Sequence, residues 1–141
     1  MAKAFKFELQ DVLDFRNFEQ EQAQNELAKA LAVENQINNH LQNIAENFIV
    51  VRRQIDASTD FEDIATGNQR KVFLETQKEE LLKQLAQAKL VSEEKRAVLA
   101  EIMKKTIALE KLKEKQLEEW KAIEDAEEAN MIDDLATSHH H

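Results

Sequence analysis

The chain has 141 residues, including one glycine and neither proline nor cysteine; 33% of the residues are charged, and the formal net charge is −9. The lack of cysteine excludes disulfides and thiolate metal sites, and no apolar run approaches the roughly 20 residues that a membrane-spanning helix requires. Because glycine and proline are the main interrupters of helices, we expect an all-α protein with a single place to turn.

The N-terminal residues lack the basic and then apolar arrangement of a secretory signal peptide. Lys6 and Glu8 interrupt the apolar side chains of Phe5, Phe7 and Leu9. We therefore expect a cytosolic protein.

A first helix is expected at about residues 6–56, where apolar side chains recur at alternating steps of three and four residues. This 3.5-residue repeat is typical of a coiled coil, in which one narrow stripe of each helix faces a partner. Ten of the thirteen positions in the predicted seam are apolar. The positions are Leu13, Arg16, Gln20, Ala23, Leu27, Ala30, Glu34, Ile37, Leu41, Ile44, Phe48, Val51 and Ile55.

The turn is expected at about residues 57–68, which is the only segment with turn chemistry. Thr59 and Glu62 have the spacing of a capping box, whose side chains satisfy free backbone donors at a helix start. Gly67 suits a left-handed helix end, and Asn68 suits the N-cap of the next helix. The sequence therefore predicts that the second long helix starts after Asn68.

A second helix is expected at about residues 69–132, and three of the nine positions in its seam are polar. These positions are Leu81, Leu85, Ala88, Ser92, Lys95, Leu99, Ile102, Thr106 and Leu109. Beyond Leu109 the apolar pattern shifts, which predicts a stutter in the coil. The shifted positions are Leu112, Leu117, Trp120 and Ile123.

The two helices predict a single domain over residues 1–136, folded as an antiparallel coiled-coil hairpin that is a monomer by itself. Residues 137–141 look like the remnant of a purification tag. A three-helix bundle would need a second helix break, which the sequence lacks. An unbroken rod that dimerises with another molecule is the competing shape.

Charge differs between the segments. Residues 1–68 carry six basic and twelve acidic side chains, residues 69–121 carry thirteen and ten, and residues 122–141 carry none and six. The opposite signs of the two helices favour their pairing, although each exposed ion pair contributes little. Lysines interleaved with acids and a negative net charge argue against a nucleic-acid partner.

The sequence contains no catalytic or cofactor-binding constellation. His40 has no second metal ligand at helical spacing, and the three terminal histidines belong to the tag-like segment. One glycine cannot build a phosphate-binding loop. We therefore expect no enzymatic activity, no metal and no cofactor.

Two groups of large apolar side chains exceed what a two-stranded seam can bury. The N-terminal group is expected beside Trp120 and Ile123, and consists of Phe5, Phe7, Leu9, Val12, Leu13, Phe15 and Phe18. The group near the turn consists of Phe48, Ile49, Val50, Val51, Val72, Phe73 and Leu74. Successive residues are distributed around a helix, so some members must point outward. Local thickening of the core and docking of another protein are the two interpretations.

The N-terminal residues resemble the opening of the flagellar export protein FliJ family. The matching pattern is F-x-L-x-x-V-L-x-x-R in residues 7–16, followed by E-x-x-x-A-x-x-x-L in residues 19–27. The resemblance extends over nearly the whole chain, because family members share its length, its plan of two long helices, and its Lys/Glu-rich second helix with a tryptophan and an acidic tail.

This resemblance implies a non-enzymatic stalk of the flagellar type III export apparatus, similar to the two-stranded stalk of the rotary ATPase gamma subunit. The end with both termini would enter the hexameric export ATPase and promote ring assembly and ATP hydrolysis. A surface nearer the turn would contact the cytoplasmic domain of the export-gate membrane protein, and some members also bind export chaperones. The implied location is cytoplasmic and peripheral, at the inner face of the cell membrane with the flagellar basal body.

By motif position, the resemblance assigns two sets of binding residues. The ATPase-ring set is Phe7, Leu9, Val12, Leu13, Arg16 and Trp120. For Arg16, an ion pair within the coil is the alternative role. The export-gate set is Ile37, Leu41, Ile44, Phe48 and Phe73. Its first four members also lie in the predicted seam, where a buried side chain is not a free docking surface, and Gln77 replaces the apolar residue expected one turn after Phe73.

Other classes of protein stay open. A coiled-coil secretion chaperone would hold clients at its tips, although the β-strands that prefoldins insert between their helices have no counterpart in this pattern. A structural tether would be a parallel dimer with a seam that continues through residues 56–68. The stalk proteins of the related injectisome share the same plan of helices.

Overall fold

The computed structural model describes residues 4–139, without the side chain of His139. It contains two α-helices, α1 at Gln10–Ala57 and α2 at Phe61–His139, and no strand within the described residues. The two helices pack against each other, as predicted for an all-α chain. Of the tag-like segment, residues 140 and 141 lie outside the described residues.

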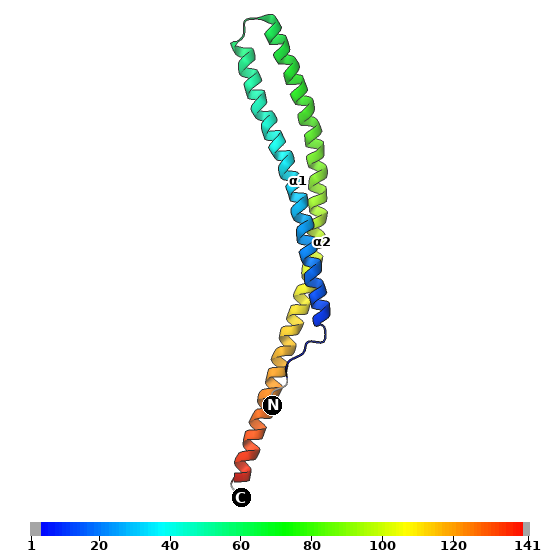
Figure 1. Cartoon of the computed structure of the whole chain (residues 1–141), viewed down its shortest axis with the longest axis vertical. Coiled ribbons are helices and arrows are strands. Elements are labelled where there is room, and N and C mark those ends of the chain that lie inside the picture. Colours follow the sequence, from blue (N-terminus) through cyan, green and yellow to red (C-terminus); the bar gives the residue numbers. More distant parts are fainter. Residues whose placement is uncertain (1–3, 140–141) are drawn as a thin grey trace. The chain divides into compact units, whose positions relative to one another are not determined.

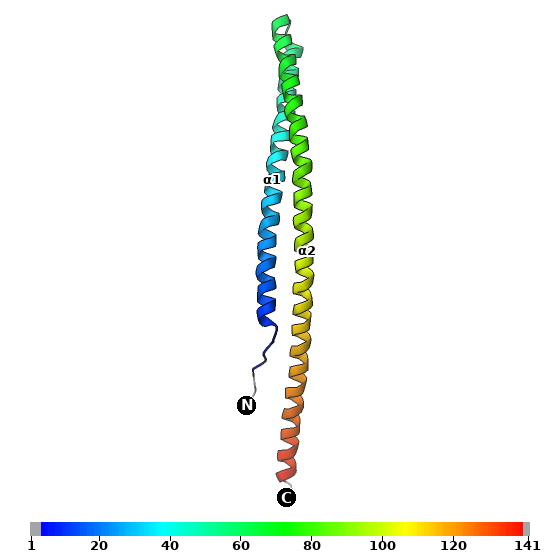
Figure 2. The same cartoon turned by 90° about the vertical axis from the view of Figure 1, so that its right-hand side faces the viewer.

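The chain divides into two compact units. The turn unit is Ala23–Leu99, in which α1 and α2 lie side by side on either side of the connection between them (Figures 1 and 2). The terminal unit is formed by the residues up to Gln22 together with those from Ala100 onward. In the terminal unit, the start of α1 lies beside the middle part of α2 (Figures 1 and 2).

The core of the turn unit is the predicted seam. Ile44, Val51 and Leu74 form its buried cluster, and the half-buried side chains of Phe48, Ile55 and Leu81 pack against it. Every predicted seam position of both helices is buried or half-buried in the described residues. The 3.5-residue repeat is therefore confirmed as the contact between the helices.

The connection between the helices is shorter than predicted and spans only residues 58–60. The side chain that caps α2 is Asp60, whose Oδ1 accepts a hydrogen bond from the backbone N–H of Glu62 at 3.1 Å. The predicted capping box of Thr59 and Glu62 is wrong, because α2 begins one residue later than that box requires. The break excludes the unbroken rod, since α1 ends at Ala57 and packs on α2 of the same chain.

The prediction that Gly67 ends a helix is also wrong. Gly67 lies in the interior of α2, which begins eight residues before the predicted start at about residue 69, and no described residue has a positive φ. Gly67 is buried and occupies a position of the seam repeat, where it faces Ile55 of α1. The glycine therefore serves close helix packing.

The seam of the terminal unit continues without the predicted stutter. The unshifted repeat gives Lys113, Gln116 and Trp120, and all three are half-buried, as is Glu124 one turn further on. Of the shifted positions, Leu112 and Ile123 are exposed, whereas Leu117 is half-buried. A half-buried Lys113 fits the seam because the long stem of a lysine can cover apolar surface, and its Nζ donates a hydrogen bond to Oε1 of Gln10 at 2.7 Å.

The N-terminal helix boundary differs from the prediction. Residues 4–9 are not helical, and α1 begins at Gln10 rather than at about residue 6. In this segment Phe5 and Phe7 point inward while Lys6 and Glu8 are exposed, an alternation of period two that suits an extended chain. At the other end, α2 continues past the predicted residue 132 to His139.

Candidate partner-binding surfaces

The residues of the opening motif divide between the core and the surface. Phe7 and Leu13 are buried against α2, with 6% and 4% of their surface exposed. Leu9 and Val12 are 39% and 41% exposed. Leu9 and Val12 are thus the apolar motif residues that a partner could reach, whereas Phe7 and Leu13 are buried in the packing between the N-terminal residues and α2.

The exposed aromatic rings near the N-terminus are Phe15 and Phe18. Each step of three residues along an α-helix rotates the side chain by about 60°. Val12, Phe15 and Phe18 therefore spread over about 120° of α1 instead of forming one flat patch, and Leu9 lies in the turn directly before the helix. The sequence placed Phe15 and Phe18 in a group too large for one seam, some of whose members had to point outward, and the structure confirms this.

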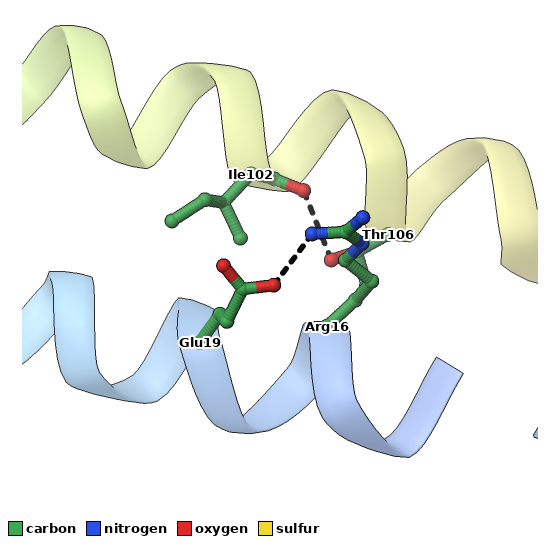
Figure 3. A network of polar contacts seen from close by, with 4 residues as sticks. All are labelled: Arg16, Glu19, Ile102 and Thr106. Carbon is green, nitrogen blue, oxygen red and sulfur yellow. Dashed lines mark hydrogen bonds and ion pairs between the residues drawn. The ribbon is translucent and has the colours of Figure 1, made fainter. Parts of the chain in front are cut away.

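Arg16 forms an ion pair within α1. Its Nη1 lies 2.6 Å from Oε1 of Glu19, and both side chains are about 30% exposed. The pair points toward α2 at Ile102 and Thr106, where the Thr106 hydroxyl donates to the backbone carbonyl of Ile102 at 3.0 Å (Figure 3). The intra-coil role considered for Arg16 is therefore present, and half-burial leaves part of its guanidinium within reach of a partner.

Trp120 packs against the N-terminal segment. Its ring centroid lies 6.0 Å from that of Phe5, with the planes tilted by 55°. This distance is typical of a stabilising aromatic pair. The expectation that Trp120 lies beside the N-terminal aromatic residues is confirmed, while Ile123 faces outward.

The residues assigned to the export gate lie mostly in the seam. Ile37 and Ile44 are buried, and Leu41 and Phe48 are half-buried. Only Phe73 is a largely free side chain, with 63% exposed. The gate role of this set stays a prediction. While the two helices are packed together, only Phe73 of the set is available for direct contact with a partner.

Two grooves flank the seam near the turn. The Ile49 flank is lined by Phe48, Ile49, Arg52, Lys71, Val72 and Glu75. The Val50 flank includes Asn47, Val50, Thr66, Arg70 and Phe73. The four-residue apolar run from Phe48 to Val51 indicated outward side chains here, but not that these side chains would line two separate grooves.

The family of the chain follows from a comparison with known protein families. The family described as Flagellar FliJ protein matches residues 5–141. The chain belongs to this family. No curated protein and no solved structure matches it.

Membership in this family makes the chain a flagellar export-related protein. The members of the family are structural proteins of the export apparatus rather than enzymes. Within the described residues, no helix has both the length and the hydropathy to cross a membrane. The same residues contain no group of three or more side chains arranged to hold a metal ion.

Proposed function

We propose that this FliJ-family chain is a non-enzymatic stalk of the flagellar type III export apparatus. Its helices would form an antiparallel coiled-coil hairpin, comparable to the two-stranded stalk of a rotary ATPase gamma subunit. The terminal unit would insert into the hexameric export ATPase and promote ring assembly and ATP hydrolysis.

Contacts between the helices support antiparallel pairing. In the turn unit, Glu26 forms an ion pair with Lys95 at 4.0 Å, and Glu34 accepts a hydrogen bond from the Ser92 hydroxyl. The partner number falls from 95 to 92 as the α1 number rises from 26 to 34, as in two strands that run in opposite directions. The contact between Glu34 and Ser92 joins two seam positions, and a polar contact there also favours one register over its neighbours.

The observation that supports the ATPase assignment is a difference in exposure within the family motif: Leu9 and Val12 are exposed, whereas Leu13 is buried. Burial of Leu13 accounts for its place in the motif by packing alone. Leu9 and Val12 contribute less to packing, since about 40% of each side chain is exposed. An apolar side chain that stays in water in the free protein and becomes covered in a complex adds to binding.

A stalk of this kind would act by breaking the symmetry of the ring. A shaft with two different helices presents a different surface to each of several identical subunits. If the shaft binds one conformation of a subunit interface better than another, nucleotide affinity at that site shifts by the same coupling free energy, typically about 1–3 kcal/mol. Hydrolysis would then proceed in order around the ring.

The Val50 flank is the better candidate for the export-gate contact. It contains Phe73 from the implied gate set together with the exposed side chain of Val50. Ile44 would support this surface from the seam, where it packs with Val51 and Leu74. Binding there would link the ATPase to the gate, hold the chain at the inner face of the membrane, and leave other exposed surfaces for export chaperones.

The test is ATP turnover by the cognate export ATPase with added protein. We expect the wild-type chain to stimulate turnover and the Leu9→Ser, Val12→Ser double variant to lose most of the stimulation. Leu90→Ser with Val98→Ser is the matched control, because both residues are apolar and exposed in the turn unit. Absence of stimulation by the wild-type chain, combined with protection of an export client from aggregation, would favour a chaperone instead.

A further inference from the structure

The Ile49 flank combines exposed apolar side chains with unpaired positive charge. Ile49 and Val72 are 51% and 67% exposed. Arg52 and Lys71 line the same groove. Arg53 follows Arg52 in α1, and none of these three cations forms an ion pair among the described residues. The only carboxylate that lines the groove is Glu75.

The last part of α2 has the opposite character. All residues from Asp125 to Ser138 are exposed, and no basic residue occurs between residues 122 and 138. At about 100° per residue, Glu124, Glu128, Met131 and Leu135 fall within a stripe of about 60° on one side of α2. This acidic stripe presents two carboxylates followed by two apolar side chains that nothing in the described residues covers.

We infer that the acidic stripe of one molecule docks on the Ile49 flank of a second copy. The stripe supplies Met131 and Leu135 for the apolar part of the groove, and Glu124 and Glu128 for Arg52 and Lys71. Charge complementarity selects this occupant, since Arg52 and Lys71 form no ion pair among the described residues and no basic residue occurs between residues 122 and 138, and both surfaces occur in every molecule. The inference does not depend on the proposed role at the ATPase.

The contact is heterologous, because two different surfaces meet. Such contacts let each molecule bind one copy through its stripe and another through its flank, so that chains of molecules form at high concentration. The net charge of −9 opposes this association at long range. Local attraction therefore has to exceed a general repulsion, which makes the complex weak and dependent on concentration.

Sedimentation equilibrium of the full chain measures the association directly. The protein is examined from about 1 µM to about 1 mM, which covers weak and moderate affinities. We expect the average mass to rise above the monomer value of 16.3 kDa as concentration increases. A mass that stays at the monomer value throughout this range would overturn the inference.

Two charge variants locate the surfaces. The flank variant carries Arg52→Glu and Lys71→Glu, and the stripe variant carries Glu124→Lys and Glu128→Lys. Each should weaken self-association at least tenfold.

Each variant has a matched control that makes the same change in net charge elsewhere on α2. The control for the flank variant is Lys89→Glu with Arg96→Glu. The control for the stripe variant is Asp133→Lys with Asp134→Lys, on other sides of α2. Circular dichroism checks that all four remain helical.

A mixture of the flank and stripe variants shows whether the stripe binds the flank or a second stripe. The flank variant keeps an intact stripe, and the stripe variant keeps an intact flank, so that together they can make one contact. We expect two samples that are monomeric alone to form one-to-one pairs when mixed, and nothing larger. Self-association of the flank variant alone would instead show that two stripes pair with each other, and would contradict the proposed contact.

Discussion

Gly67 of α2 and Ile55 of α1 are packed so closely that no larger residue fits between the helices at this point. A Cβ atom at position 67 would lie 2.5 Å from Cγ1 and 2.9 Å from Cδ1 of Ile55. Ile55 cannot simply turn away, because a β-branched side chain in a helix has one strongly preferred χ1 rotamer. The single glycine of the chain thus sets how near the helices approach beside the turn.

We predict that Gly67→Ala destabilises the protein even though alanine is the better helix former. The gain in helix propensity is about 1 kcal/mol, whereas overpacking costs about 1–3 kcal/mol. In an Ile55→Ala background the clash disappears, so that the same substitution should become stabilising. Urea unfolding of the four proteins in this cycle measures the change of sign, and equal effects of Gly67→Ala in both backgrounds would refute the packing argument.

Asp60 should be the residue that caps α2. Replacing it with alanine removes the acceptor of the Glu62 N–H and should lower the free energy of unfolding by about 1 kcal/mol. Thr59→Ala is the matched control and should have little effect. If the threonine variant proved the less stable one in thermal unfolding, the capping box expected from the sequence would be right after all.

Substitution of Ile44 should affect mainly stability, whereas substitution of Phe73 should affect mainly binding to the export gate. Ile44→Ala opens a cavity in the buried cluster and should cost about 2–5 kcal/mol. Phe73→Ala removes an exposed ring and should change stability by no more than about 0.5 kcal/mol. Binding to the cytoplasmic domain of the export gate, measured calorimetrically, should nevertheless fall for Phe73→Ala. Unchanged binding by this variant would remove the Val50 flank from the gate contact.

Arg16 should contribute little to stability despite its short ion pair with Glu19. Half-exposed pairs of this kind are worth about 0–1 kcal/mol. Glu19→Gln removes the pair and leaves the arginine, so a role of Arg16 at the ATPase predicts that Arg16→Gln reduces stimulation of turnover while Glu19→Gln does not. Equal stimulation by both variants would assign Arg16 to the helix pair alone.

The fold could be predicted from the sequence wherever the seam was apolar. Ile37, Ile44 and Val51 follow one repeat, and the structure buries all three. The repeat was lost beyond Leu109, where the apolar Leu112 was assigned to the seam instead of its neighbour Lys113, although the stem of a lysine can pack in a core. The predicted stutter was the result of this choice.

Local signals near the turn were misleading for a physical reason. Gly67 can end a helix, but it can also let two helices approach, and only the contact with Ile55 distinguishes these roles. The candidate sites were limited in the same way. Periodicity placed Ile37 and Ile44 in the seam, but the exposure of Leu9, Val12 and Phe73 depends on how the partner helix covers them.

Site-specific photo-crosslinking to the export ATPase tests the proposed role of the terminal unit most directly. A photoreactive amino acid is introduced singly at Leu9, Val12, Ile49 or Leu90, all of which are exposed. We predict crosslinks to the ATPase from positions 9 and 12 and none from positions 49 and 90. Crosslinks from Ile49 or Leu90, with none from Leu9 and Val12, would contradict insertion through the terminal unit.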